Sequence, residues 1–198
     1  MNKINYQLKL DKIIDGLDKR PSLLLHSCCG PCSSYCLTYL KDFFDITVLY
    51  YNPNIYPEEE YNKRLGEQRR LIEDYMEGVK LMTLPYDHSE FTEHVKGYEN
   101  EREGGRRCER CFRLRLMKTA QTAAAMGFDY FGTTLTVSPH KNAQVINRVG
   151  EEIKEELAIS PSWLYSDFKK KGGYGQSIEL SRKYGLYRQN YCGCEFAK

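Results

Sequence analysis

The sequence predicts an α/β fold, a three-layer, Rossmann-like sandwich with a mainly parallel sheet. Short runs of β-branched and aromatic residues alternate along the chain with stretches whose apolar residues recur at helical spacing. Strands that alternate with helices in this way form a parallel sheet with helices on both faces. The 198 residues suit one domain with a real core, and the 41% apolar content argues against a disordered chain.

The first elements along the chain are a helix, a strand and a second helix. Residues 5–19 carry leucine and isoleucine at helical spacing, so we expect residues 1–20 to form a helical extension. Residues 21–26 predict a buried strand that runs directly into the loop 27–32, and a helix follows to about residue 41. We expect residues 21–198 to form a single catalytic α/β domain with a cysteine-containing C-terminal tail.

The later elements follow the same alternation. Pro57 and the three glutamates after it favour the start of a helix that reaches about residue 76. Gly127 suits the end of another long helix. In order, we expect strands over 45–51, 79–84 and 128–134, and helices over 57–76, 88–100, 108–126, 141–157 and 176–184.

Membrane and secretory functions are not indicated by this chain. Its apolar runs are far shorter than the roughly 20 residues of a membrane-spanning helix. The N-terminal segment has no continuous apolar stretch of the kind that directs secretion. We therefore expect a cytoplasmic protein with no membrane partner. Thiols stay reduced there, so clustered cysteines bind metal or perform redox chemistry.

Seven of the eight cysteines fall in three clusters. The clusters are Cys28-Cys29-x-x-Cys32, Cys108-x-x-Cys111 and Cys192-x-Cys194. If a helix begins near Cys108, Cys108 and Cys111 share one face of its first turn, where the positive helix end lowers the pKa of a thiol. Cys36, one turn into a predicted helix, fits core packing instead.

Two kinds of metal centre are compatible with the clusters. A structural zinc site would take four thiolates from the pairs Cys29/Cys32 and Cys108/Cys111, and an iron–sulfur cluster also takes four. Zinc explains neither the vicinal Cys28 nor the tail pair, so the pattern favours iron–sulfur. Cys192 and Cys194, with only Gly193 between them, predict a strained redox-active disulfide pair or two further metal ligands.

Other candidate residues come from strand ends and from charge. His140 follows the last long predicted strand, at the sheet edge where reactive groups of parallel sheets collect, and is a candidate proton donor. His26, at the end of a buried strand, suits a hydrogen-bonded core position. Two basic segments, 102–118 and 169–198, predict contact with a polyanion. The candidate contacts in them are Arg113, Arg115, Lys169, Lys170 and Lys171.

Five stretches of the chain resemble the QueH family of epoxyqueuosine reductases, in the same order from about residue 23 to residue 197. They read LLLHSCCGPCSSYCL, YYNPNIYPEEEYNKR, GGRRCERCFRLRL, FGTTLTVSPHKN and FKKKGGYGQSIELSRKYGLYRQNYCGCEFA. The resemblance implies cobalamin-independent reduction of epoxyqueuosine to queuosine at the tRNA wobble position, the last step of queuosine biosynthesis. It also implies a fold similar to the HUP and PP-loop (adenine nucleotide alpha-hydrolase-like) proteins, a [4Fe-4S] cluster beside a further iron ion, and an unidentified electron donor.

The same resemblance implies roles for individual cysteines. Cys28, Cys29, Cys108 and Cys111 would hold the cluster, Cys32 would bind the extra iron, and Cys192 and Cys194 would form the redox-active pair. The spacing alone favours Cys32 over Cys28 as a cluster ligand, so the choice between these two stays open. Two other functions also stay open, a zinc-stapled RNA-binding module and a general thiol–disulfide oxidoreductase.

A tRNA anticodon loop as substrate would be read by stacking and phosphate contacts. Six tyrosines lie in the segments near the predicted site. They are Tyr50, Tyr51, Tyr56, Tyr174, Tyr187 and Tyr191. We expect most of them to be core or generic surface residues and one or two to stack on the modified base.

Overall fold

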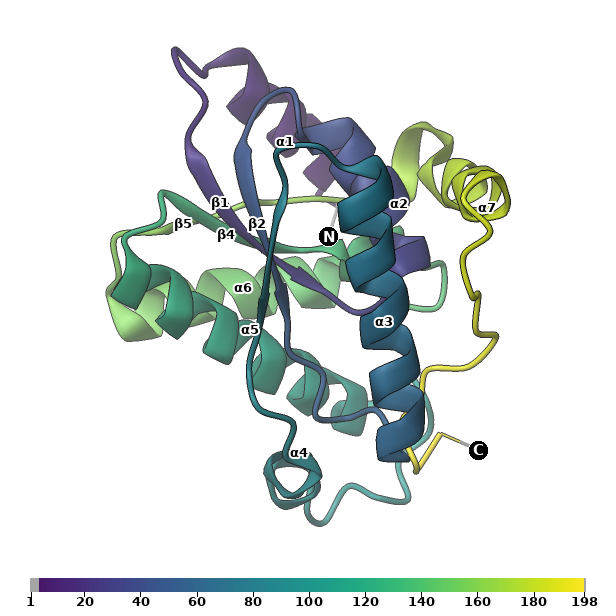
Figure 1. Ribbon diagram of the computed structural model, residues 1–198. Helices are drawn as coiled ribbons and strands as arrows, with labels where there is room; N and C mark the ends of the chain where they lie inside the picture. Colours follow the sequence, from purple (N-terminus) through teal and green to yellow (C-terminus); the bar gives the residue numbers. More distant parts are fainter. Residues whose placement is uncertain (1–3, 198) are drawn as a thin grey trace.

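The computed structural model describes residues 4–197, and its centre is a five-stranded sheet (Figure 1). The strand order is β3-β2-β1-β4-β5, and every pairing is parallel. The predicted α/β sandwich with a parallel sheet is thereby confirmed. The strands are β1 (Ser22–Ser27), β2 (Asp45–Tyr50), β3 (Lys80–Thr83), β4 (Tyr130–Thr133) and β5 (Ser162–Trp163).

Seven α-helices and two short 3₁₀ helices are seen in the described residues. The α-helices are α1 (Tyr6–Asp15), α2 (Gly30–Leu40), α3 (Glu58–Tyr75), α4 (His88–His94), α5 (Arg106–Met126), α6 (Ala143–Leu157) and α7 (Gly173–Lys183). The 3₁₀ helices are η1 (Thr134–Val137) and η2 (Lys170–Gly172). None of the helices within residues 4–197 is long and apolar enough to cross a membrane.

The helices form two layers around the sheet, and β1 shows why. Leu23 and Leu25 point to one face, into a core shared with α2, α3 and α7, whereas Leu24 points to the other, against α5 and α6. All three leucines are fully buried, as expected for a strand covered on both sides. Leu10 of α1 joins the first of these cores, so the leading helix packs against the same domain.

Several boundaries differ from the prediction, each for a local reason. Helix α4 ends at His94 rather than near residue 100, and the chain then turns at Gly97 with a positive φ. Helix α7 begins at Gly173, three residues before the predicted start. That glycine lies tightly against Tyr35, where a Cβ would come within 2.4 Å of the ring. Strand β5 is only two residues long and gave no alternating pattern to detect.

The strand order places a crevice at one edge of the sheet. The connections from β1 through β2 to β3 run through α2 and α3 on one face, whereas α5 and α6 cover the other face after the chain crosses to β4. The order therefore reverses between β1 and β4. Ligands of such sheets bind beyond the carboxyl ends of the strands at this reversal.

Candidate metal centre and active-site cavity

A cavity of about 580 Å³ opens at the carboxyl ends of β1 and β4. Cys28, Cys29 and Cys32 line it, because β1 runs straight into them and α2 begins between them. Gly30 allows this tight start, since a Cβ there would lie 3.2 Å from the carbonyl oxygen of Glu67. The predicted strand thus runs directly into the first cysteine loop, as expected, and brings it to the carboxyl edge of the sheet.

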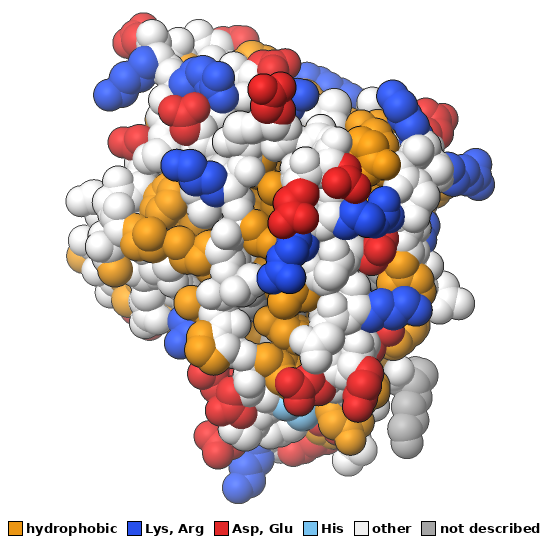
Figure 2. Space-filling view, in the orientation of Figure 1, with side chains coloured by type: hydrophobic (Ala, Val, Ile, Leu, Met, Phe, Trp, Pro, Cys, Tyr) orange, Lys and Arg blue, Asp and Glu red, His pale blue; other side chains and the backbone are white. Residues whose placement is uncertain are grey.

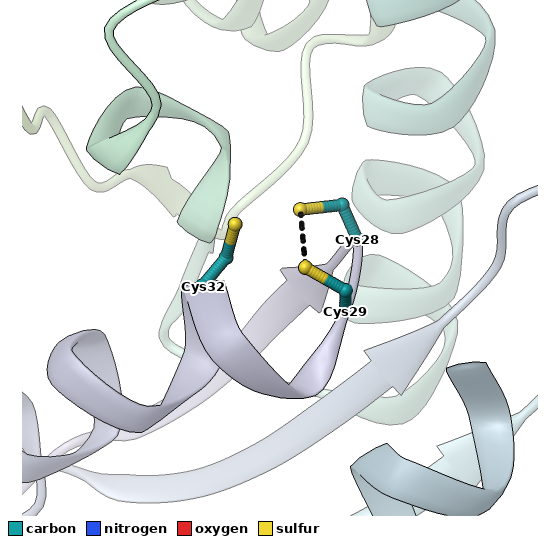
Figure 3. Close-up of side chains that lie close together, drawn as sticks. All are labelled: Cys28, Cys29 and Cys32. Atoms are coloured by element: carbon teal, nitrogen blue, oxygen red, sulfur yellow. Dashed lines mark hydrogen bonds between the residues drawn. The ribbon is translucent and has the colours of Figure 1, made fainter. Parts of the chain in front are cut away.

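The three thiols of this loop point toward one another (Figure 3). Their Sγ atoms all lie within 4.8 Å of one another, and those of Cys28 and Cys29 are 3.8 Å apart. In the part of the chain from residue 4 to 197, it is the one cluster of three or more His, Cys, Asp or Glu side chains with such spacing. The structure thus brings Cys32 close to both Cys28 and Cys29. The spacing of the cysteines had favoured Cys32 as a cluster ligand, whereas the family resemblance implied Cys28 in that role.

A polar network beneath the loop fixes its shape. Ser27 donates a hydrogen bond of 2.6 Å to the side-chain oxygen of Gln68, and Asn52 donates one of 2.8 Å to the Ser27 carbonyl. His26 contacts Thr133 Oγ1 at 2.9 Å through Nδ1 and the Tyr51 carbonyl at 3.1 Å through Nε2. Burial lowers the pKa of His26 to about 3, so the ring is neutral and structural, as predicted.

The three thiols of the triad affect one another's protonation. Hydrogen bonds from Cys29 and Cys32 lower the pKa of the Cys28 thiol. The interactions with Cys28 raise the pKa of Cys29 to about 12 and also raise that of Cys32. Only one of the three thiols therefore ionises readily. Because thiolates are the form that binds metal, a metal ion would have to displace the other two protons.

The remaining cysteine pairs lie around a second, adjoining cavity of about 300 Å³. Cys108 and Cys111 come from the first turns of α5, and Cys192 and Cys194 come from the tail. Cys192 lines both cavities. All eight cysteines are free thiols here, and Cys36 is buried in the core as predicted.

One electrostatic expectation for this pair is wrong. Burial raises the pKa of Cys111 to about 12, whereas the helix start was expected to lower it. The reason is depth, because the Cys111 thiol is buried below the first turn among apolar side chains such as Phe91 and Val95. The backbone N–H of Gly104 donates a 3.2 Å hydrogen bond to Cys108 Sγ.

Two cations lie where the two cavities meet. Arg115 on α5 is 2% exposed and donates to the Cys111 carbonyl at 3.2 Å, and Lys141 lines both cavities. Neither forms an ion pair with a carboxylate in residues 4–197. Burial lowers the pKa of each cation, but nearby thiols, including Cys28 and Cys192, outweigh it and raise both pKa values.

A buried charge is stable only with a partner. Glu103 lines both cavities but pairs with neither cation, and the groups that raise the pKa values of Arg115 and Lys141 are the cysteines. A metal centre ligated by four thiolates carries net negative charge. The donor set at this junction therefore fits a thiolate-ligated cluster or ion. The burial of Arg115 also corrects its prediction as a surface contact for tRNA, since its guanidinium cannot reach an RNA phosphate on the outer surface.

The tail is held against α3 and the loop before it. The Tyr56 N–H donates to the Gly193 carbonyl at 2.9 Å, and Arg64 Nη1 donates to the Cys192 carbonyl at 3.0 Å. Arg64 is itself held by Glu60 at 2.6 Å. His88 contacts Glu195 at 2.7 Å further along the tail. These contacts place the cysteine pair beside the two cavities.

Of the other predicted site residues, His140 lines the cavities and the basic residues discussed below do not. His140 is exposed and lines both cavities. Arg113 pairs with Glu152 and Glu156 on α6, and Lys169 Nζ is engaged by Asp167 and by the carbonyl of Thr136. Lys171 pairs with Asp11 at 2.8 Å, whereas Lys170 is exposed. None of Arg113 and these three lysines lines either cavity.

Sequence reasoning missed Arg64 and Lys141. Arg64 is one of many charged residues in the sequence of α3. No local sequence pattern shows that the C-terminal tail packs against it. Lys141 had a detectable signal, because it directly follows His140 at the end of the β4 segment. Asn52 had the same signal after β2 and was treated only as a loop residue.

The chain was compared with known proteins. The family model described as "Epoxyqueuosine reductase QueH" matches residues 23–198. Relatives that carry this name are 44% identical in Streptococcus pyogenes serotype M1, over 98% of this chain and 78% of the relative, and 43% identical in Staphylococcus aureus strain Mu50, over 98% and 84%. The Thermotoga maritima relative is 36% identical over 89% of this chain and 90% of its own length.

A solved structure agrees with the fold. The U34-tRNA thiolase NcsA from Methanococcus maripaludis, solved with its [4Fe-4S] cluster, matches with a TM-score of 0.54, covering 98% of this chain and 67% of the other. Its 12% sequence identity means that this likeness concerns the fold alone. The family assignment rests instead on the match over nearly the whole chain and on the relatives above, and by these the chain belongs to the epoxyqueuosine reductase QueH family.

Proposed function

We propose that this chain is an epoxyqueuosine reductase that removes the epoxide oxygen of epoxyqueuosine at the wobble position of tRNA and yields queuosine. One observation carries the proposal beyond family membership. Seven cysteines, the buried Arg115 and the half-buried Lys141, two cations without an ion-pair partner among the described carboxylates, meet at two adjoining cavities at the switch point of the sheet. This donor set suits an anionic metal centre beside a space large enough for a nucleobase. We place this activity in the cytoplasm, where tRNA and reduced thiols occur together.

The cysteine roles that we propose are those that the family resemblance implies. Cys28, Cys29, Cys108 and Cys111 would hold a [4Fe-4S] cluster, and Cys32 would ligate an additional iron ion. The mutual approach of Cys28, Cys29 and Cys32 within 4.8 Å supports a ligand role for Cys32. When bound, such a cluster supplies one-electron transfer.

The reaction needs two electrons and two protons. The carbon–oxygen bonds of the epoxide break, a carbon–carbon double bond forms, and the oxygen leaves as water. Closure of the Cys192/Cys194 dithiol to a disulfide releases two electrons and two protons, which balances the reaction. Cys192 lines the larger cavity, so this pair is adjacent to the substrate space. An external electron donor then restores the dithiol.

The proton to the departing oxygen can come from the cavity wall. His140 is exposed, lines both cavities and follows η1 at the carboxyl end of β4. We propose it as the proton donor. Lys141, its neighbour in the chain, adds a positive charge beside the developing oxyanion.

Anaerobic purification tests the proposal. We expect a coloured protein that contains iron and acid-labile sulfide and converts epoxyqueuosine-containing tRNA to queuosine-containing tRNA, measured by mass spectrometry of the released nucleosides. A colourless protein with stoichiometric zinc and no sulfide supports the zinc-stapled RNA-binding module. The 3.8 Å separation of Cys28 and Cys29 Sγ is also compatible with one tetrahedral ion. Reduction of generic disulfides without turnover of the tRNA supports a general thiol–disulfide oxidoreductase.

A further inference from the structure

The tyrosines near the site divide sharply by exposure. Tyr50 and Tyr51 are buried and belong to the core. Tyr174 is 37% exposed and Tyr191 is 47% exposed. Both of these exposed rings line the 580 Å³ cavity, Tyr174 from the first turn of α7 and Tyr191 from the tail. Large aromatic rings left in solvent at a cavity edge are typical of surfaces that bind a partner.

Each of these two rings makes a cation–π contact with an arginine. The guanidinium carbon of Arg188 lies 5.5 Å from the centre of the Tyr174 ring, and that of Arg64 lies 5.0 Å from the centre of the Tyr191 ring. Such a contact is favourable and restricts the ring. A cation covers one face of a ring at most, so the exposed part of each tyrosine stays available to a second planar group.

The cavity wall is positive. It includes the cations Arg64, Arg115, Lys141 and Arg188, and Glu103 is the single acidic residue among the described residues that line it. On the face that Figure 2 shows, basic and acidic side chains are mixed over the upper part and acidic ones gather at the lower end. Arg64 is paired with Glu60, and Arg115 and Lys141 face the cysteines, which leaves Arg188, beside Tyr174, as a wall cation without an ion pair among the described residues. Aromatic rings beside cations are the combination that binds unpaired nucleotides, through base stacking and phosphate contacts.

We propose that Tyr174 and Tyr191 form a stacking clamp for unpaired bases of an RNA loop, with Arg188 beside the phosphates that join them. The two rings lie on segments far apart in the chain that meet at one cavity, so a base in the cavity has a ring available to the nucleotides that flank it. This inference rests on the proposed function, because the loop is the one that delivers the modified base.

Binding of an RNA hairpin tests the clamp without requiring turnover. The probe is a fluorescently labelled hairpin with an unmodified tRNA anticodon loop, and the readout is anisotropy. We expect Tyr174→Ala and Tyr191→Ala each to weaken binding by about 5- to 150-fold, because stacking contributes that range per base. Tyr174→Phe and Tyr191→Phe keep the ring and should bind within about twofold of the wild type, by the same stacking argument.

The matched control is Tyr75→Ala. Tyr75 is similarly exposed and stacks on Tyr184, with ring centres 4.1 Å apart, but lines neither cavity. It should bind the hairpin as the wild type does. Iron content and thermal unfolding of every variant show whether a loss of binding reflects damage to the fold or the metal centre.

The outcomes separate the clamp from the reductase activity. Alanine variants that bind the hairpin like the wild type, or a Tyr75→Ala variant that loses as much, overturn the clamp even if turnover is normal. A wild type that does not bind the hairpin also overturns it. Selective loss of binding in the two alanine variants supports the clamp, and this result stands even if the wild type fails to reduce epoxyqueuosine.

Discussion

Arg113 and Arg115 show how two neighbouring charges take different roles. Sequence analysis treated them together as tRNA contacts. On a helix, residues two apart point about 200° from each other. Arg113 therefore faces α6 and its glutamates, whereas Arg115 enters the interior beside the cysteines. Helical periodicity alone could have separated the two, but only the tertiary structure shows what the inner one meets.

The charge of Arg115 leads to a first prediction. Arg115→Met removes a buried cation whose partners are thiolates, and loss of one partner of a buried charge pair costs about 3 kcal/mol or more. We expect lower iron and sulfide content after anaerobic reconstitution and a parallel loss of turnover. Arg113→Met, which removes only a surface ion pair, serves as the control and should load iron normally. Normal loading of Arg115→Met would contradict the proposed charge balance.

The ligand assignment leads to a second prediction. Cys108→Ala and Cys111→Ala should each abolish cluster binding, because loss of one thiolate opens the cluster to solvent. Iron, sulfide and visible absorbance are measured on the same samples. Cys36→Ala is the control, since Cys36 is a buried thiol of the core that lines neither cavity. A full visible spectrum in either ligand variant would show that the residue is not a ligand.

The tail pair leads to a third prediction. Cys192→Ser and Cys194→Ser should keep iron and sulfide but lose turnover, because a single thiol cannot close a disulfide. The measurement combines metal content with the yield of queuosine. Loss of iron in these variants would instead make them metal ligands, which their position on the smaller cavity with Cys108 and Cys111 allows.

At the scale of elements, helix α3 supports the tail as well as covering the sheet. Glu67 accepts a hydrogen bond of 2.7 Å from the Tyr187 N–H, and Arg70 donates to the carbonyls of Tyr184 and Gly185 at 3.0 and 2.9 Å. One turn earlier, Arg64 holds the Cys192 carbonyl. A single helix face thus fixes the turn after α7 and the approach to the cysteine pair.

The charge of Glu67 gives a fourth prediction, on pH. Burial raises the pKa of Glu67, but hydrogen bonds from Arg70 and Tyr187 outweigh it and lower the pKa. A carboxyl whose pKa is lowered by folding stabilises the fold above its ordinary pKa, near 4.5, and that contribution is lost as the pH falls through the lower folded value. We expect Glu67→Gln to lower the free energy of unfolding by about 1 kcal/mol at pH 7 and to match the wild type more closely at acidic pH. Urea unfolding at both pH values checks this, and an equal difference at both would exclude the charge as its cause.

The strands show what the sequence could predict at this scale. β1, β2 and β4 lie within a residue or two of their expected ranges, because apolar and β-branched runs mark buried strands. Strand β5 was missed because its two residues pair through Trp163 opposite Phe131, a contact that no local pattern encodes. The tail was rightly expected to be irregular, but its anchorage on α3 depends on tertiary hydrogen bonds.

At the scale of the whole molecule, the sequence predicted where in the fold the site lies, but not how its residues are arranged around the two cavities. The alternation of strands and helices, with the first cysteines at a strand end, indicated the reactive edge of the sheet. The strand order, the second cavity and the convergence of α5 and the tail on it follow from packing of segments that are far apart in the chain. Seven cysteines were identifiable from spacing, whereas their division between two cavities was not.

Binding of tRNA gives a fifth prediction. Lys170 and Lys171 are both exposed, beside the α7 start that carries Tyr174. Lys170→Glu and Lys171→Glu should weaken binding to modified and unmodified tRNA alike, and each lost phosphate contact should reduce the slope of log affinity against log salt by about 0.9 or less. Lys80→Glu, at the amino end of edge strand β3, is the control. Unchanged slopes would leave stacking and shape as the basis of recognition.

The distance along the chain between the two walls of the larger cavity affects how the protein is made. Ribosomes synthesise Cys28 and Cys29 early, whereas Arg188 to Cys192 and Ala197, which complete the lining of the cavity, are made much later. The vicinal thiols of a nascent chain therefore exist before the wall that encloses them in the finished protein. A reducing environment has to protect these early cysteines in the interval.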